Sequence, residues 1–220
     1  GTLLQPPWPD VVVSCGRRAI GPALWVKRQS GGRAKAVHAQ HPRTAVGAYD
    51  VIIGQSHDGL GGPNVIKVKG SMHRITTGVL AAAAARQGAV FEDIPHPTIA
   101  VLIGGTNSTY QMTAEITRRL ADDLQSLVAR SGCGLLVTAS RRTGEENLAL
   151  LRERITGPKI YFWDGMGDNP YFAFLAQADS ILVTGDSVNM ISEACFTGKP
   201  VHVLALEGGS GSKFERFHTE

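Results

Sequence analysis

The chain has 220 residues, of which 43% are hydrophobic and 19% are charged, and this balance is typical of a globular protein with a sizeable core. The net charge of +3 is small and the Lys and Arg residues are spread along the chain, which argues against a nucleic-acid-binding protein. No apolar run is long enough to span a membrane and no secretory signal is present, so we expect a cytoplasmic protein, either free or in peripheral contact with a membrane. Three cysteines lie far apart without a CxxC pair, which argues against a disulfide framework and a zinc site: Cys15, Cys133 and Cys195.

Short β-type runs alternate with helical patterns along the chain, as they do in parallel sheets built from βαβ units. In the first part the sequence predicts four strands and only one helix, so we expect an incomplete Rossmann-like lobe. The start at Gly1 rather than Met agrees with a fragment of a longer protein. The predicted strands are 10–14, 34–39, 50–53 and 64–68, and the predicted helix is 19–29.

A second helix is predicted over residues 72–87, because this segment contains five consecutive alanines and alanine has the highest helix propensity. Segment 94–97 follows, and its two prolines favour extended backbone. We place the domain boundary here. Residues 1–90 are then a partial N-terminal lobe with a linker helix, and residues 91–220 are a C-terminal nucleotide-binding lobe.

The second part predicts a parallel sheet that is buried on both faces, because its strands are continuous apolar runs. The helix predicted over residues 113–131 has one apolar stripe with charged residues outside it, so it packs one face on the sheet. The fold class is therefore α/β, with two Rossmann-like lobes. The predicted strands of this part are 98–103, 135–139, 159–163, 180–184 and 200–206, and a further helix is 171–177.

A Gly-rich loop lies between strand 98–103 and helix 113–131. Ser108 and Gln111 have the spacing of a capping box, which predicts that the helix begins near Ser108. A helix N-terminus carries free N–H groups and a partial positive charge, so this loop is a candidate phosphate site. The alternative is an ordinary turn that uses glycine for a positive φ, since neither a Walker A sequence nor a complete GxGxxG is present. The candidate residues are Gly104, Gly105, Thr106, Asn107 and Ser108.

A second strand-to-helix turn leads from Asp186 and Ser187, either of which can cap the helix, to Glu193. A carboxylate two turns into the helix can accept two hydrogen bonds from the 2′ and 3′ hydroxyls of a ribose. The alternative is a glutamate on an exposed helix flank, which is where most glutamates lie.

Two other loops follow strands of the same part. Strand 159–163 ends in aromatic residues, and Trp163 is a candidate for contact with a flat base. Arg142 precedes a predicted helix start, where Thr143 and Glu146 again have capping-box spacing, and can pair with a phosphate. A solvated arginine is the alternative.

Three residues of the first part are weak candidates for a catalytic base: His41, His57 and Asp58. Histidines in loops seldom have this role. Carboxylates at metal-ligand spacing are lacking, so no metal site is predicted.

Together, the second-part motifs resemble the C-terminal domain of GT-B glycosyltransferases. This resemblance implies that Gly105 and Thr106 contact the diphosphate of a nucleotide sugar, that Glu193 binds the ribose and that Trp163 lies near the base.

Nearly the whole chain is also similar to the bacterial relatives of the plant mitochondrial-fission factor named for its elongated-mitochondria phenotype. This family is labelled a predicted nucleoside-diphosphate-sugar epimerase, and in plants it recruits a dynamin-like GTPase. The segments that carry the resemblance are 14–18, 40–43, 57–59, 103–107, 140–143 and 186–194.

We therefore expect a metal-independent, GT-B-like glycosyltransferase or nucleotide-sugar-binding protein, with a nucleotide-sugar donor, an unidentified acceptor and no further cofactor. The alternative is a non-catalytic interaction protein that retains the fold, because fold does not fix function. An epimerase is less favoured, since a dinucleotide fingerprint with an acidic partner is missing.

Overall fold

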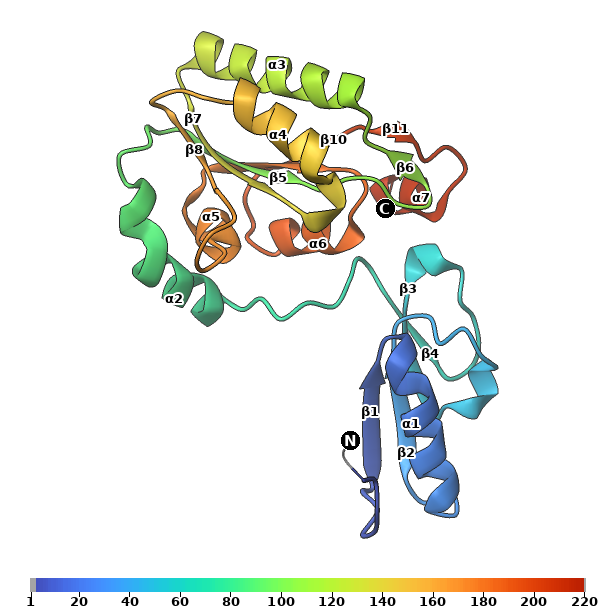
Figure 1. Cartoon of the computed structure of the whole chain (residues 1–220). Helices are drawn as coiled ribbons and strands as arrows, with labels where there is room; N and C mark the ends of the chain where they lie inside the picture. Colours follow the sequence, from blue (N-terminus) through green and yellow to red (C-terminus); the bar gives the residue numbers. More distant parts are fainter. Residues whose placement is uncertain (1–2, 220) are drawn as a thin grey trace. The chain divides into compact units, whose positions relative to one another are not determined.

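The computed structural model describes residues 3–219, which form two compact units on either side of the Met72–His73 bond (Figure 1). Our predicted boundary near residues 88–97 falls inside the second unit. The reason is that helix α2 (Thr77–Gln87) packs on helix α5 (Tyr171–Gln177) and buries Ala83 in the same apolar cluster as Phe174. Residues before Thr77, which we expected to be helical, are extended, and Thr76 caps α2 by accepting a hydrogen bond from the Val79 N–H.

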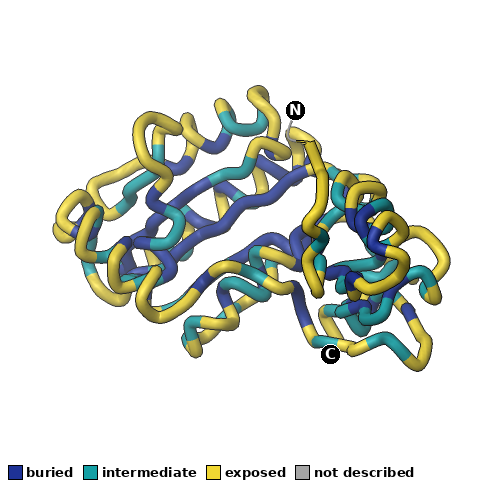
Figure 2. Tube along the Cα trace, turned by 90° about the horizontal axis from the view of Figure 1, so that it is seen from below, coloured by how far each residue is buried: buried dark blue, intermediate teal, exposed yellow. Residues whose placement is uncertain are grey.

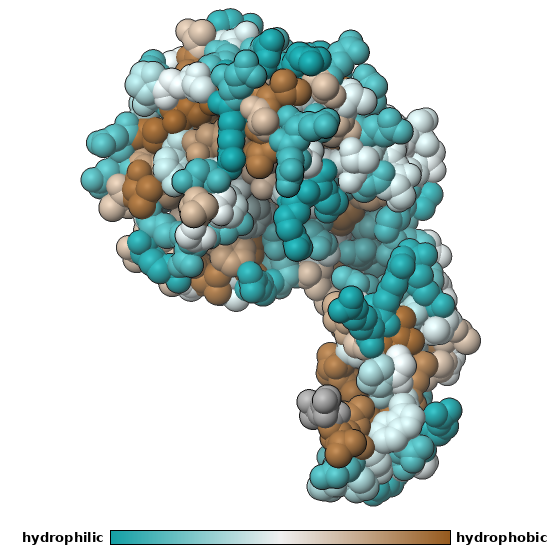
Figure 3. Space-filling view, viewed as in Figure 1, coloured by the Kyte–Doolittle hydropathy of each residue, from teal (hydrophilic) through white to brown (hydrophobic). Residues whose placement is uncertain are grey.

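The first unit is a parallel sheet with the strand order β1-β2-β3-β4, as the apolar runs of the sequence predicted. Helix α1 (Arg17–Gln29) contributes Leu24 to a small core with Ile52 of the sheet. Residues Val11 and Val13 of β1 are 51% and 73% exposed, and the apolar surface over this strand is visible in Figure 3. The strands are β1 (Val11–Cys15), β2 (Lys35–Ala39), β3 (Val51–Gln55) and β4 (Val65–Val68).

The second unit contains a five-stranded parallel sheet with the order β10-β9-β5-β7-β8, which confirms the predicted fold class. Helices α3 and α4 cover one face, and α2, α5 and α6 cover the other. The central strands are buried between these layers, whose outer sides are exposed (Figure 2). The strands are β5 (Thr98–Ile103), β7 (Gly134–Ala139), β8 (Ile160–Phe162), β9 (Ser180–Thr184) and β10 (Val201–Leu204). The helices not yet delimited are α3 (Ala114–Ser131), α4 (Glu145–Arg154), α6 (Val188–Cys195) and α7 (Lys213–Thr219).

Two helix starts differ from the sequence prediction. Helix α3 is capped by Thr113, whose hydroxyl accepts from the Ile116 N–H at 3.3 Å, and not by Ser108. Helix α4 begins after Gly144 without a side-chain cap, because the Thr143 hydroxyl donates instead to the carbonyl of Gly104. In the first case residues 110 and 111 form a short strand with residues 207 and 208, so the helix begins after them, and in the second a tertiary hydrogen bond uses the residue that local spacing marks as a cap.

Several short elements complete the described chain. The segment before α3 forms strand β6 (Tyr110–Gln111), which pairs antiparallel with β11 (Glu207–Gly208). Short 3₁₀ segments are Val46–Ala48, Ser56–Asp58, Gly88–Phe91 and Arg141–Thr143. Within residues 3–219, no helix combines the length and the apolar character that crossing a membrane requires.

Candidate functional site

The candidate residues of the second unit follow the carboxyl ends of neighbouring parallel strands, so they share one edge of the sheet. The Gly-rich loop follows β5, Arg142 follows β7, Trp163 follows β8, and the segment from Asp186 to Glu193 follows β9. The strand order β9-β5-β7 places the loop of residues 104–109 between the other two strand ends.

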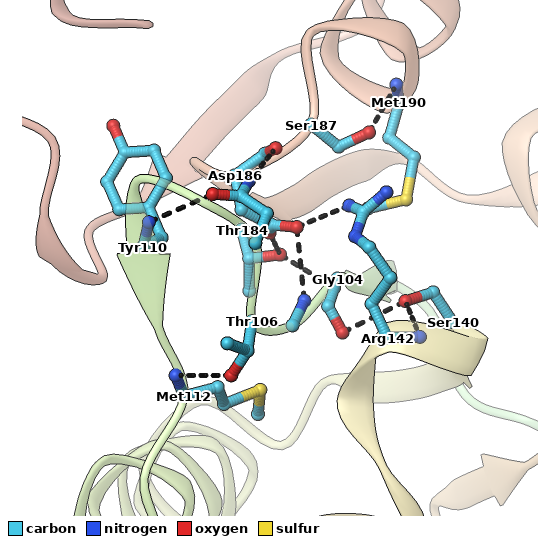
Figure 4. A network of polar contacts seen from close by, with 12 residues as sticks. Gly104, Thr106, Tyr110, Met112, Ser140, Arg142, Thr184, Asp186, Ser187 and Met190 are labelled. Atoms are coloured by element: carbon cyan, nitrogen blue, oxygen red, sulfur yellow. Dashed lines mark hydrogen bonds and ion pairs between the residues drawn. The ribbon is translucent and has the colours of Figure 1, made fainter. Parts of the chain in front are cut away.

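Asp186 lies at the centre of a polar network at this edge (Figure 4). Its side chain is fully buried, and its carboxylate accepts hydrogen bonds from the Gly105 N–H at 3.1 Å and the Thr184 hydroxyl at 2.6 Å. The same carboxylate forms an ion pair with the guanidinium of Arg142. The Thr184 hydroxyl in turn accepts from the Gly104 N–H at 2.7 Å. The network therefore joins the loops that follow β5, β7 and β9.

This network explains why two glycines stand after β5. A Cβ atom on Gly104 would lie within 3.0 Å of the Asp186 carboxylate, and one on Gly105 would lie within 3.0 Å of the backbone of Arg142. Neither glycine has a positive φ, so the turn does not need glycine for its backbone conformation. Their N–H groups already donate within the protein, the space beside Gly104 holds the Asp186 carboxylate, and the space beside Gly105 holds the backbone of Arg142.

The rest of the Gly-rich loop is also fixed by internal bonds. The Thr106 N–H donates to the carbonyl of Arg142 at 3.2 Å, and the Thr106 hydroxyl accepts from the Met112 N–H at 3.1 Å. Asn107 Oδ1 accepts from the N–H groups of Thr109 and Tyr110, while Asn107 Nδ2 donates to the carbonyl of Asp186. Ser108 lies at the surface. The loop therefore forms one side of this sheet edge, and most of its polar groups are hydrogen-bonded within the protein.

Glu193 faces a cavity of about 270 Å³ at the same edge. Its carboxylate oxygen Oε2 accepts from the hydroxyl of Tyr171 at 2.7 Å. Burial, together with the nearby Glu193 carboxylate, raises the pKa of Tyr171, so this hydroxyl keeps its proton and remains a donor. Ser187 caps α6 by accepting from the Met190 N–H at 3.3 Å, which fixes the start of the helix that carries Glu193. The cavity is lined by Arg74, Asn169, Tyr171, Phe172 and Glu193.

A second cavity of about 110 Å³ shares Asn169 and Tyr171 with the first. Its other walls come from the ends of β5 and β7 and from Met190 of α6. The hydroxyl of Ser140, one of these wall residues, accepts from the N–H of Arg142 at 3.2 Å. The two cavities therefore line the edge from Glu193 to the immediate neighbourhood of Arg142.

Trp163 does not line either cavity. Its ring packs against the apolar cluster beneath the sheet, and its Nε1 donates to the carbonyl of Met166 at 3.0 Å. Asn169 and Tyr171, which follow it in the chain, line both cavities.

Arg74 is a further residue that the sequence did not single out. It was expected inside a helix, yet it lies in the extended segment before α2 and its guanidinium carbon is 5.3 Å from the centroid of the Phe172 ring. Only the packing of this segment on the second unit reveals that Arg74 and Glu193 line one cavity.

The three candidates for a catalytic base in the first unit have these surroundings. His57 is 1% exposed, and His41 accepts the N–H of Arg43 on its own loop at 3.0 Å. Asp58 is half-buried. A different histidine, His38, bonds to the Ser14 hydroxyl at 2.9 Å, and burial lowers the pKa of His38. Across residues 3–219, no cluster of three His, Cys, Asp or Glu side chains could hold a metal ion.

Comparison with known proteins places the chain in a family. The family model described as Mitochondrial fission ELM1 matches residues 1–220. The mitochondrial fission protein ELM1 of Arabidopsis thaliana is 29% identical over 222 aligned residues, which cover 90% of this chain. The chain spans 52% of the length of that relative.

Two solved structures share the fold. The UDP-GlcNAc 2-epimerase of Methanocaldococcus jannaschii has a TM-score of 0.59 and 15% identity, over 96% of this chain and 70% of that chain. The UDP-GlcNAc 2-epimerase of Neisseria meningitidis, bound to UDP-GlcNAc, has a TM-score of 0.58 and 13% identity, over 96% and 62%. The α/β architecture with two Rossmann-like units is thus of the GT-B type.

Proposed function

Because the chain belongs to the mitochondrial fission ELM1 family and has a GT-B-type fold, we propose that its second unit binds a nucleotide sugar at the carboxyl edge of the five-stranded sheet. The observation that carries this proposal is the placement of Glu193. Its carboxylate is half-buried, is oriented by the Tyr171 hydroxyl and faces a cavity at the sheet edge where α/β proteins bind ligands. A carboxylate held in this way accepts both hydroxyls of a ribose. The fold neighbours named for UDP-GlcNAc make this sugar nucleotide the first ligand to test.

The diphosphate would lie beside the Gly-rich loop without using the N–H groups of Gly104 and Gly105, which donate internally. The charge that offsets it comes from the start of α6 at Ser187 and from the exposed part of Arg142, whose guanidinium would be shared between the diphosphate and its ion pair with Asp186. Glu193 lies five positions after Val188, and at about 1.5 Å per residue the helix start lies roughly 7.5 Å from the ribose position. That separation suits a nucleoside diphosphate. Under this proposal Arg142 and the start of α6 take the place of a metal ion.

A second candidate function is a non-catalytic interaction protein that retains the nucleotide-sugar fold. The 29% identity to a protein named for mitochondrial fission favours it. Under this alternative the ligand would bind without being consumed. Incubation with UDP-GlcNAc, followed by quantification of released UDP and of free sugar, separates an enzyme from a binding protein.

Calorimetry of the chain with UDP-GlcNAc in the presence of EDTA tests the binding proposal. We expect binding by the wild type, and a loss of about 1–3 kcal/mol in Glu193→Ala, because the ribose hydroxyls lose a charged acceptor. Glu153→Ala, on the exposed side of α4, is the matched control and should bind as the wild type does. Binding that disappears with EDTA, or a Glu193→Ala variant as tight as the wild type, would contradict the proposal.

A further inference from the structure

We infer that Arg74 and Asn169 select the nucleobase, and that they favour a base with a keto group, uracil or guanine, over one with an amino group at the same position, cytosine or adenine. This inference rests on the proposed nucleotide binding and adds the chemical class of the base. Both residues line the cavity that Glu193 faces.

The first observation concerns the contacts of the Arg74 side chain. Its guanidinium carbon lies 5.3 Å from the centroid of the Phe172 ring, and this cation–π contact holds the side chain at the wall of the cavity. Within residues 3–219 it forms no ion pair, although Glu193 lines the same cavity. A guanidinium has N–H donors and no acceptor. Arg74 therefore offers unused donors to whatever occupies this space.

The second observation is the orientation of Asn169. Its Oδ1 accepts the N–H of Tyr171 at 3.0 Å, so its acceptor is engaged at the start of α5. The group left for a ligand is the Nδ2 amide, which is a donor. The Tyr171 hydroxyl is committed to Glu193. The guanidinium of Arg74 and the Nδ2 group of Asn169 are thus hydrogen-bond donors at the wall of the cavity, and Glu193 is its charged acceptor.

This arrangement of one acceptor and several donors matches a nucleoside whose base carries a keto group. The ribose donates its hydroxyl protons to Glu193, and the base that extends from it meets Arg74 and Asn169. Uracil O4 and guanine O6 accept hydrogen bonds, whereas cytosine N4 and adenine N6 donate them. An amino base would set its donor against those of Arg74 and Asn169 and would lose the hydrogen bond that a keto base makes there. Both residues are exposed, so the cost of the mismatch is the lost bond and not a buried unpaired group.

The test compares UDP, GDP, CDP and ADP by calorimetry with the whole chain and EDTA, since the four ligands share the ribose and the diphosphate. We expect UDP and GDP to bind at least about tenfold more tightly than CDP and ADP, the effect of roughly one charged hydrogen bond. In Arg74→Met, which keeps an unbranched chain over Phe172 but has no donor, the ratio of UDP to ADP affinity should fall towards one. Asn169→Leu should reduce the same ratio without a change of charge.

The ratio is the readout, because loss of a positive charge in Arg74→Met weakens every diphosphate to some extent. Arg86→Met, on the exposed side of α2, is the control for that charge effect and should keep the wild-type ratio. Equal affinities for all four ligands in the wild type, or an unchanged ratio in both Arg74→Met and Asn169→Leu, would overturn the inference and leave nucleotide binding standing. If none of the four ligands binds, the proposed function itself fails and the inference falls with it.

Discussion

The carboxylate of Asp186 and the N–H of Gly105, 81 residues apart in the chain, form a buried hydrogen bond of 3.1 Å. Through it, and through the ion pair between Asp186 and Arg142, the loop after β9 is fastened to the loops after β5 and β7. An acidic side chain thus occupies the space beside paired glycines where an external anion would otherwise fit. The consequence is that this corner of the sheet edge has a structural role, and the two cavities lie beside it.

Removal of the Asp186 carboxylate should therefore destabilise the second unit. In Asp186→Ala the Gly105 N–H, which is buried, and the Thr184 hydroxyl lose their acceptor, and we expect a loss of about 2–4 kcal/mol in the free energy of unfolding. Urea denaturation followed by Trp163 fluorescence, with Trp8 and Trp25 of the first unit replaced by Phe in both proteins, measures this. Asp123→Ala, on the exposed side of α3, should change the free energy by less than about 0.5 kcal/mol. Equal stability of the two variants would show that the network contributes nothing.

The tight approach at Gly104 leads to a second prediction. A methyl group there meets the Asp186 carboxylate within 3.0 Å, so Gly104→Ala should cost at least about 2 kcal/mol through strain and displacement of that side chain. Gly78→Ala is the matched change, because Gly78 is exposed near the start of α2 and a Cβ there has only an ordinary contact at 3.9 Å. It should be neutral or slightly stabilising. Thermal unfolding of both variants checks the difference, and a Gly104→Ala protein as stable as Gly78→Ala would refute the packing argument.

The sequence predicted the layers of the fold well, because the buried strands are apolar runs whose character is local. Strand Ser180–Thr184 and helix Tyr171–Gln177 have the bounds that were expected. The helix caps at Ser108 and Thr143 were wrong, since capping spacing does not show that residues 110 and 111 pair with β11 or that the Thr143 hydroxyl meets a tertiary acceptor. Thr143 could have capped α4, but the approach of Gly104 gave its hydroxyl a buried acceptor.

The candidate site was predictable only in part for the same reason. Glu193 stands out because its helix follows a strand of the sheet. The pairing of Asp186 with Gly105 depends on β9 lying next to β5, and this strand order cannot be read from the order of strands along the chain. Arg74 is 119 positions from Glu193, and its role depends on how an irregular segment packs.

In the first unit, Asp50 should control stability at low pH. It accepts the N–H of Ala36 at 2.8 Å and pairs with Lys27 at 2.8 Å, and the bond from Lys27 is the main cause that lowers the pKa of Asp50 to about 2. A depressed folded-state pKa contributes stability that is complete above the ordinary value near 3.8 and is lost as the pH falls through about 2.

Denaturation of wild type and Asp50→Asn between pH 7 and pH 2, both carrying Trp163→Phe so that Trp8 and Trp25 report this unit alone, tests that expectation. The wild type should be the more stable protein at pH 5 to 7, and the difference should shrink between about pH 4 and pH 2 as the carboxylate takes up its proton. A difference that stays constant over this range would mean that the Asp50 charge does not contribute.

The hydroxyl of Tyr171 should act on ligand binding more than on folding. In Tyr171→Phe, Glu193 loses the donor at 2.7 Å that orients it, but this half-buried carboxylate can turn to water, so the free energy of unfolding should fall by no more than about 1 kcal/mol. The ribose acceptor then has to be ordered by the ligand itself, and affinity for UDP-GlcNAc should fall about three- to tenfold. Tyr161→Phe is the control, because that ring packs between Phe91 and Phe174 in the apolar cluster and its loss of a hydroxyl should leave affinity unchanged. Calorimetry on the two variants decides the matter: a Tyr171→Phe protein that binds like Tyr161→Phe would show that Glu193 needs no orientation by its neighbour.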